Sequence, residues 1–122
     1  MDEYNKNLEL IEWLKTFKGG DNEDVPLHTE SLNDMKTLVQ LCKDHNIPQP
    51  EIFPWAGGNG VQAEWSYDWY LEVDSCDKGV SILCVNERYY DDAINIKVNN
   101  ILDAFKVVKA FIKHVVDLEG ER

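Results

Sequence analysis

Residues 61–84 read VQAEWSYDWYLEVDSCDKGVSILC, and apolar and polar side chains alternate through most of this run. Val61, Ala63 and Trp65 share one parity, and the polar residues between them share the other. A period of two places successive side chains on opposite faces of a β-strand. Three half-buried strands are therefore predicted, over residues 61–66, 69–74 and 80–84.

Short connections between these strands predict an antiparallel sheet. Asp77-Lys78-Gly79 is typical of a hairpin turn, and Ser66-Tyr67-Asp68 is the loop expected before it. Neither connection is long enough for the crossover that joins parallel strands. Ile52-Phe53 is expected to add a short first strand. Residues 94–98 alternate like a last strand, whereas residues 89–93 suit a loop or a helical turn.

Apolar residues in steps of three and four predict helices on both sides of the strand region. The first is expected from Tyr4 to Phe17, where Gly19-Gly20 ends it. The second is expected to begin at Ser31, whose hydroxyl suits a cap, with Asp34 in the reciprocal capping position. Asn46 is its expected left-handed stop.

A third helix is expected to open at Asn100, with Asp103 three residues later. Its predicted buried stripe is Ile101, Phe105, Val108, Ile112 and Val115. The layout is therefore α-α-β-β-β-β-α, a single α+β domain over residues 1–122 with an antiparallel meander sheet. Because each strand is apolar on one face only, the helices are expected to cover one side of the sheet. The open side would present Gln62, Glu64, Ser66, Tyr70, Glu72 and Asp74.

Acidic residues dominate the chain. Asp and Glu number 23 against 12 Lys and Arg, which gives a formal net charge of −11. A field of this sign repels phosphate, so direct binding to DNA, RNA or an anionic membrane is disfavoured. The same field attracts basic protein surfaces and accelerates association with them, although acidity also serves solubility alone.

Cysteine usage and the first residues of the chain bear on its location. Cys42, Cys76 and Cys84 are an odd number, and none of them forms a C-x-x-C pair. Residues 1–20 lack the basic start and the apolar stretch of a secretory signal. No apolar run approaches the roughly 20 residues that cross a bilayer. A reducing cytoplasm is therefore the expected location.

Patterns that predict a metal or cofactor are weak in this chain. Cys42 and His45 have C-x-x-H spacing. However, Cys42 lies on the apolar stripe of its helix, and His45 suits a helix end, where it satisfies carbonyl groups. Gly57-Gly58-Asn59-Gly60 is expected to be a turn, because no helix and no lysine follow it as in a phosphate-binding loop. We therefore predict no cofactor and no metal site.

Glu64 and Glu72 form a carboxylate pair that suits acid–base chemistry. With Ser66-Tyr67-Asp68 as the loop, Glu64 is expected to lie opposite Tyr70, with Glu72 as its diagonal neighbour. Such chemistry needs a cleft that shifts the pKa of one carboxyl group, and nothing in the sequence predicts a cleft. A small enzyme that uses this pair is kept as an alternative of a different class.

Part of the strand region resembles a pattern in small proteins of phages, plasmids and bacterial genomes. The matching segments are Pro50-Glu51-Ile52-Phe53-Pro54, Gly57-Gly58, Val61-Gln62-Ala63-Glu64-Trp65 and Leu71-Glu72-Val73. The resemblance covers residues 25–85, and Asn59-Gly60 lengthen the usual turn. It implies a fold and a mobile-element setting, and it supplies no activity and no site residue.

Aromatic residues lie close to carboxylates in this region. Trp65 and Trp69 are expected to point into the core by parity, whereas Trp55, Tyr67 and Tyr70 are free to face solvent. The alternative for Trp55 is that it folds back over the sheet edge. Exposed aromatic side chains supply much of the binding energy at protein interfaces. We therefore predict a protein-binding inhibitor or adaptor, with no catalytic activity, that docks on a basic protein surface. The partner-binding residues are predicted to be Asp21, Glu23, Asp24, Trp55, Glu64, Tyr67, Asp68, Tyr70, Glu72, Asp74, Asp91 and Asp92.

In a mobile-element setting, the sharper hypothesis is a phage-type anti-defence protein. It would occupy the nucleic-acid channel of a nuclease or CRISPR effector, and its carboxylates would replace phosphates. An immunity protein or antitoxin that neutralises a basic toxin relies on the same electrostatics and is one alternative. A homo-oligomer with a structural role, such as a homodimer, is another.

Overall fold

The computed structural model describes residues 2–16, 28–54, 59–67, 69–86 and 93–120. The strands form one sheet in the order β1-β2-β3-β4-β5, and every neighbouring pair is antiparallel. The predicted α+β meander is confirmed, with one strand more than the predicted layout contained. The elements in chain order are α1 (Glu3–Leu14), α2 (Thr29–Asp44), β1 (Glu51–Pro54), β2 (Val61–Ser66), β3 (Trp69–Cys76), β4 (Gly79–Asn86), β5 (Ala93–Val98) and α3 (Ile101–Gly120).

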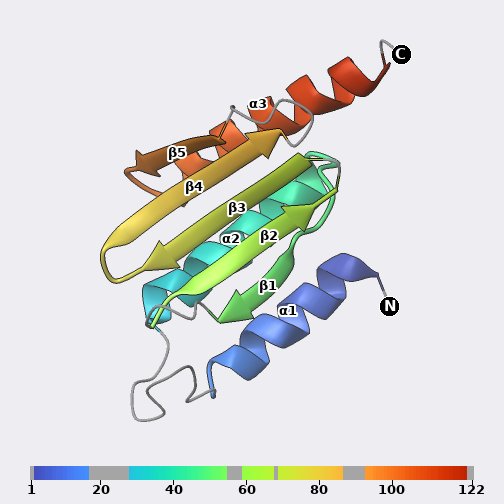
Figure 1. Ribbon diagram of the computed structural model, residues 1–122. Coiled ribbons are helices and arrows are strands. Elements are labelled where there is room, and N and C mark those ends of the chain that lie inside the picture. The colour runs from blue at the N-terminus through green and yellow to red at the C-terminus, as the bar shows by residue number, and fades with distance from the viewer. Residues whose placement is uncertain (1, 17–27, 55–58, 68, 87–92, 121–122) are drawn as a thin grey trace.

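The helices pack on one side of the sheet, as the one-sided strands require (Figure 1). α2 and α3 cover the sheet, and α1 packs against α2 and β1. The core between these layers contains Trp65, Leu71 and Val73 from the strands, and Met35 and Val108 from the helices. On β2 and β3, side chains of the other parity are half-buried, so one face of the sheet remains without a helix.

Local sequence signals account for most element ends. Asp2 caps α1 by accepting a hydrogen bond from the Asn5 backbone N–H at 2.8 Å. Asn100 caps α3 by accepting one from the Asp103 N–H at 2.9 Å, as predicted. Asn46 has a φ of 57°, which confirms it as the left-handed stop after α2. Gly79, with a φ of 120°, closes the hairpin predicted at residues 77–79.

The start of the second helix was predicted wrongly. α2 begins at Thr29 with His28 in the cap position, and Ser31 lies inside the helix. Ser31 is fully buried, and its hydroxyl contacts other side chains instead of capping the backbone. Ser31 and Asp34 therefore do not form a helix cap. Both side chains contact Ser75 on β3, a distant residue that their spacing in the sequence does not indicate.

Several predicted features fall at or beyond the limits of the described residues. α1 ends at Leu14, and Phe17 and Gly19-Gly20 lie outside the described residues. β5 confirms the last strand that was predicted from the alternation of residues 94–98, although Ile94 is 53% exposed. In the described part of the chain, no helix has the length and apolarity to cross a membrane.

Candidate protein-binding face

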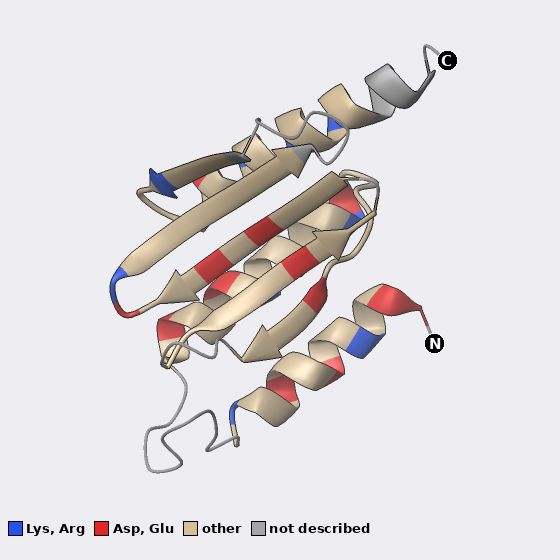
Figure 2. Ribbon diagram, viewed as in Figure 1, with Lys and Arg blue, Asp and Glu red and all other residues tan. Residues whose placement is uncertain are grey.

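A row of three glutamates crosses the uncovered face of the sheet. Glu51 on β1 lies directly opposite Glu64 on β2, and Glu64 lies directly opposite Glu72 on β3. The next row contains Gln62 and Asp74, which are also paired. Figure 2 shows these acidic residues as red segments on β1, β2 and β3. We call Glu51, Glu64, Glu72 and Asp74 the acidic face.

The pairing of β2 with β3 differs from the predicted register by two residues. Glu64 lies opposite Glu72, whereas the prediction placed Tyr70 there. The predicted register would set Trp65 directly against Trp69 on the buried side. In the structure Trp65 lies opposite Leu71, so the two indoles are staggered. The shift brings the two carboxylates from diagonal to directly opposite positions, closer than predicted.

Asp74 is not an ordinary surface carboxylate. Its Oδ1 atom is buried and has no hydrogen-bond partner among the described residues. Burial, together with a hydrogen bond and repulsion from Glu72, raises the pKa of Asp74 to about 8. Asp74 therefore keeps its proton near neutral pH. The negative charge of the acidic face then comes from the three glutamates.

Tyr70 orients one of these glutamates. Its hydroxyl donates a hydrogen bond to Glu72 Oε1 at 2.6 Å, and its side chain is half-buried on the uncovered face. Burial and the neighbouring Glu72 carboxylate raise the pKa of Tyr70, so its hydroxyl stays protonated and continues to donate. Tyr70 thus holds a carboxylate in place, a different role from the solvent-facing contact that was predicted.

A hollow of about 440 Å³ adjoins the acidic face at the end of β2. Glu51 and Glu64 line it together with Glu3, and Tyr67, 54% exposed, forms part of its rim. Pro48, Gln49, Pro50, Trp65 and Ser66 complete the lining. Three of the nine lining residues are carboxylates, and none is Lys or Arg. This composition suits a cationic group.

The wall of the hollow is held by side chains from α1, from β2 and from the segment between α2 and β1. Trp65 Nε1 donates to the Pro48 carbonyl at 2.6 Å. The buried Asn7 of α1 donates to Gln49 Oε1 at 3.0 Å and to the Pro50 carbonyl at 2.9 Å. Gln49 Nε2 in turn donates to the Val39 carbonyl at 2.9 Å. These bonds fix the segment 48–50 before any ligand arrives, which lowers the entropy cost of binding.

The structure brings together part of the predicted partner-binding set. Glu64, Tyr70, Glu72 and Asp74 share the uncovered face, and Tyr67 borders the hollow. Glu51 was missed, although its place beside the buried Ile52 gives the required parity. The other predicted residues lie outside the described residues, and these are Asp21, Glu23, Asp24, Trp55, Asp68, Asp91 and Asp92.

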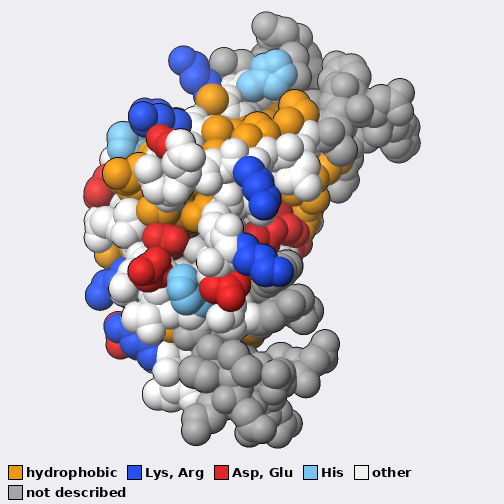
Figure 3. Space-filling model, turned by 90° about the vertical axis from the view of Figure 1, so that its left-hand side faces the viewer, with side chains coloured by type: hydrophobic (Ala, Val, Ile, Leu, Met, Phe, Trp, Pro, Cys, Tyr) orange, Lys and Arg blue, Asp and Glu red, His pale blue; other side chains and the backbone are white. Residues whose placement is uncertain are grey.

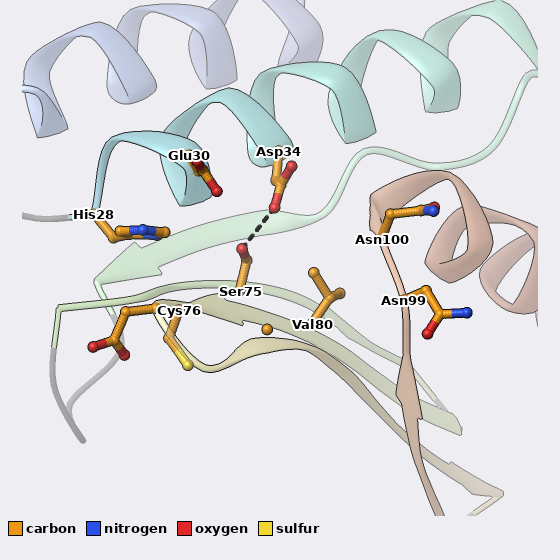
Figure 4. Close-up of a pocket in the computed structure, with 10 residues that line it drawn as sticks. His28, Glu30, Asp34, Ser75, Cys76, Val80, Asn99 and Asn100 are labelled. Atoms are coloured by element: carbon orange, nitrogen blue, oxygen red, sulfur yellow. Dashed lines mark hydrogen bonds between the residues drawn. The ribbon is translucent and has the colours of Figure 1, made fainter.

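A second polar cluster lies at the opposite end of β3 (Figure 4). The Ser75 hydroxyl donates to Asp34 Oδ2 at 2.8 Å and lies 3.1 Å from Ser31 Oγ. His28 Nδ1 lies 2.9 Å from the same Ser31 hydroxyl. His28, Asp34 and Ser75 line a cavity of about 260 Å³, with Asn99 and Asn100 on its far side.

This cluster has the residue types of a catalytic triad without its connectivity. In a triad the carboxylate orients the histidine, and the histidine activates the serine. Here the carboxylate of Asp34 bonds Ser75, and His28 contacts Ser31. Ser75 is also only 2% exposed. The cluster therefore satisfies buried polar groups between α2 and β3.

Replacing Ser75 with alanine is expected to lower the free energy of unfolding by about 1–2 kcal/mol, because Asp34 loses its buried donor. Burial already raises the pKa of Asp34, and the Ser75 hydrogen bond opposes that rise. The variant should therefore raise this pKa further. NMR titration of the Asp34 carboxyl carbon measures this pKa, and Ser81→Ala on the uncovered face is the control. An unchanged pKa would contradict the role given to Ser75.

The cysteines and histidines do not converge on a metal. Cys42 and Cys84 belong to the core, which confirms the predicted place of Cys42. Burial raises the pKa of the Cys42 thiol to about 12 and that of Cys84 to about 11, so both thiols stay protonated. Among the described residues, no group of three or more His, Cys, Asp or Glu is placed to hold a metal ion.

The hollow combines carboxylates, the exposed Tyr67 ring and a wall fixed by hydrogen bonds. The resemblance to small phage, plasmid and bacterial proteins stays a prediction. Comparison with protein-family models, with curated proteins and with solved structures found no match for this chain.

Proposed function

We propose that this chain is an acidic inhibitor or adaptor that binds a basic surface of another protein through its acidic face. The observation that carries the proposal is the row of Glu51, Glu64 and Glu72 on adjacent strands. Neighbouring strands are about 4.8 Å apart. A nucleic-acid strand carries one phosphate charge per roughly 3.4 Å of helix axis. The row therefore approaches the charge density of a phosphate backbone.

The sharper form of this proposal is a phage-type anti-defence protein. Its glutamates would take the place of phosphates in the nucleic-acid channel of a nuclease or CRISPR effector. A β-sheet suits this role, because hydrogen-bonded strands hold the carboxylates at a fixed spacing and little entropy is lost on binding. Tyr70 adds to this order by holding the Glu72 carboxylate.

The hollow supplies an anchor at the end of the row. Glu51 and Glu64 belong to both the row and the hollow, so a basic side chain entering there meets two carboxylates at once. An arginine fits best, since its guanidinium bonds carboxylates in a plane and stacks on an aromatic ring such as that of Tyr67.

Capture of partners from a host lysate with matched charge variants tests this proposal. The face variant carries Glu51→Gln, Glu64→Gln and Glu72→Gln. The control carries Glu9→Gln, Glu12→Gln and Glu30→Gln, which remove the same charge from exposed helix positions. We expect the face variant to lose at least about tenfold in retained partner, and the control to lose less than about twofold. Equal losses, or no capture at low salt, would refute a localised acidic site.

Competition with nucleic acid distinguishes the kinds of partner. Added duplex DNA or RNA should release a captured protein whose nucleic-acid channel holds the acidic face, because both ligands need the same basic surface. A toxin that does not use nucleic acid would stay bound, which would favour the immunity-protein alternative. Raising the salt from about 0.05 M to about 0.5 M should release either partner, since screening weakens the attraction.

The enzymatic alternative has a specific weakness. A carboxylate pair works as acid and base when both groups face one enclosed substrate site. Glu64 lines the hollow, and Glu72 is not among its lining residues. The two carboxylates lie directly opposite each other, but the hollow does not enclose both of them, and binding is the function that the face supports better.

A further inference from the structure

The two edges of the sheet are protected to different degrees. β1 ends at Pro54, which donates no backbone hydrogen bond, and α1 packs against this strand. Both are devices that keep an edge strand from pairing with another chain. β5, at the other edge, contains neither proline nor glycine. α3 lies behind β4 and β5 (Figure 1), and no described strand pairs with the outer side of β5.

Aliphatic side chains accompany the open edge. Ile94, Ile96 and Val98 lie opposite the buried residues of β4, so they project on the helix side of the sheet. Ile94 is 53% exposed, and Leu102 at the start of α3 is 56% exposed. In Figure 3, hydrophobic side chains gather in the upper part of the molecule, where β5 meets α3. An unpaired strand beside exposed aliphatic side chains marks an association site.

We propose that β5 pairs antiparallel with β5 of a second copy and joins two five-stranded sheets in a two-fold symmetric dimer. The inference rests on the β5 edge alone and does not depend on the acidic face. In the dimer, both acidic faces lie on the same side of the joined sheet. The protein then presents two equivalent surfaces to a partner.

The side-chain pattern of β5 selects one register. With Ile96 on the two-fold axis, each Ile94 lies opposite Val98 of the second copy, and each Asn95 lies opposite Lys97. Aliphatic side chains then meet on the helix side, and no like charges are directly opposed. A shift of two residues in one direction would leave Val98 without a strand residue opposite, because β5 begins at Ala93. A shift of two in the other direction would set Lys97 directly against Lys97 of the second copy. A shift of one would place the two sets of helices on opposite sides.

Local charge at this edge permits a second copy, and the small area implies a weak dimer. The sheet carboxylates lie on β1–β3, away from this edge. α3 has 20 residues, and such a helix is about 30 Å long. Only the part of α3 that lies beside the 6 residues of β5, about 20 Å of strand, can contribute. With a helix diameter of about 10 Å, the buried strip is roughly 200 Å² per copy, which lies below the standard size of a specific interface. We expect a dissociation constant on the order of 10–100 µM.

Sedimentation equilibrium of the full chain, from about 5 µM to about 1 mM, tests the dimer. Ile94→Lys should raise the dissociation constant at least tenfold, since it places a charge in the aliphatic seam. Phe53→Lys is the matched control, because Phe53 is 38% exposed on the other edge strand. Added salt should strengthen the dimer, because each copy carries −11. A monomer throughout the range, or equal effects of the two variants, would overturn the proposal.

Cysteine cross-linking tests the register. Directly opposite residues of antiparallel strands have Cα atoms about 4.5–5.5 Å apart, which a disulfide spans. Ile96→Cys in a Cys76→Ser background should therefore give a covalent dimer under mild oxidation, whereas Asn95→Cys should not. A cross-link from Asn95→Cys alone would overturn the register. Slower amide hydrogen exchange in β5 at high protein concentration checks the pairing independently of either variant.

Discussion

Replacing Trp65 with alanine is expected to lower the free energy of unfolding by about 3–5 kcal/mol, the range for a large aromatic lost from a packed core. Trp65 is 1% exposed, and it packs between the sheet and the helices opposite Leu71. Its indole N–H also donates to the Pro48 carbonyl at 2.6 Å. The variant therefore opens a cavity and leaves a carbonyl without its donor. Urea unfolding followed by circular dichroism measures the loss.

Two further variants separate the causes of this loss. Trp65→Phe keeps most of the packing and removes the donor, so a smaller cost of about 1–2 kcal/mol is expected. Tyr67→Ala, at the exposed rim of the hollow, should cost less than about 1 kcal/mol. If Trp65→Ala were no more costly than Tyr67→Ala, Trp65 would not be the support of the sheet and of the wall of the hollow.

The strands were predictable because their signal is local. A buried strand face requires apolar residues at every second position, and most of residues 61–84 meet this requirement without interruption by proline, with the buried Ser75 as a polar exception. Asn46 and Asn100 were predictable for a related reason, since their conformations or hydrogen bonds involve neighbours within a few residues. The uncovered face followed from the same parity, which placed Glu64, Glu72 and Asp74 together.

The remaining features depend on contacts between distant residues. The register of β2 with β3 places Trp65 opposite Leu71, and the sequence of the loop between the strands did not predict this pairing. The Ser75 hydroxyl meets Ser31 and Asp34 across sequence separations of 44 and 41 residues. The capping spacing of Ser31 and Asp34 suggested a local role for both. The local pattern thus predicted the wrong helix start, because Ser31 and Asp34 form their hydrogen bonds with Ser75 and do not cap the helix.

The raised pKa of Asp74 gives the stability of the protein an unusual pH dependence. A group whose pKa is higher in the folded state binds more protons when folded, so its stabilising contribution is lost as the pH rises. The ordinary value is 3.8 and the folded value is about 8. The contribution is therefore fully present below about pH 4 and absent above about pH 8. Asp74→Asn removes this dependence, because an amide does not ionise.

Asp74→Asn should consequently stabilise the protein at pH 9 by about 2 kcal/mol, a value reduced for solvent screening of the exposed part of the side chain. At pH 4 the two proteins should be nearly equal, because Asp74 is protonated there. Asp77→Asn in the exposed turn is the control, and Glu72→Gln should weaken the effect by removing the neighbouring charge. Urea unfolding at both pH values measures the difference. A difference between wild type and Asp74→Asn that is the same at both pH values would mean that Asp74 ionises normally, and the acidic face would then carry a fourth charge at neutral pH.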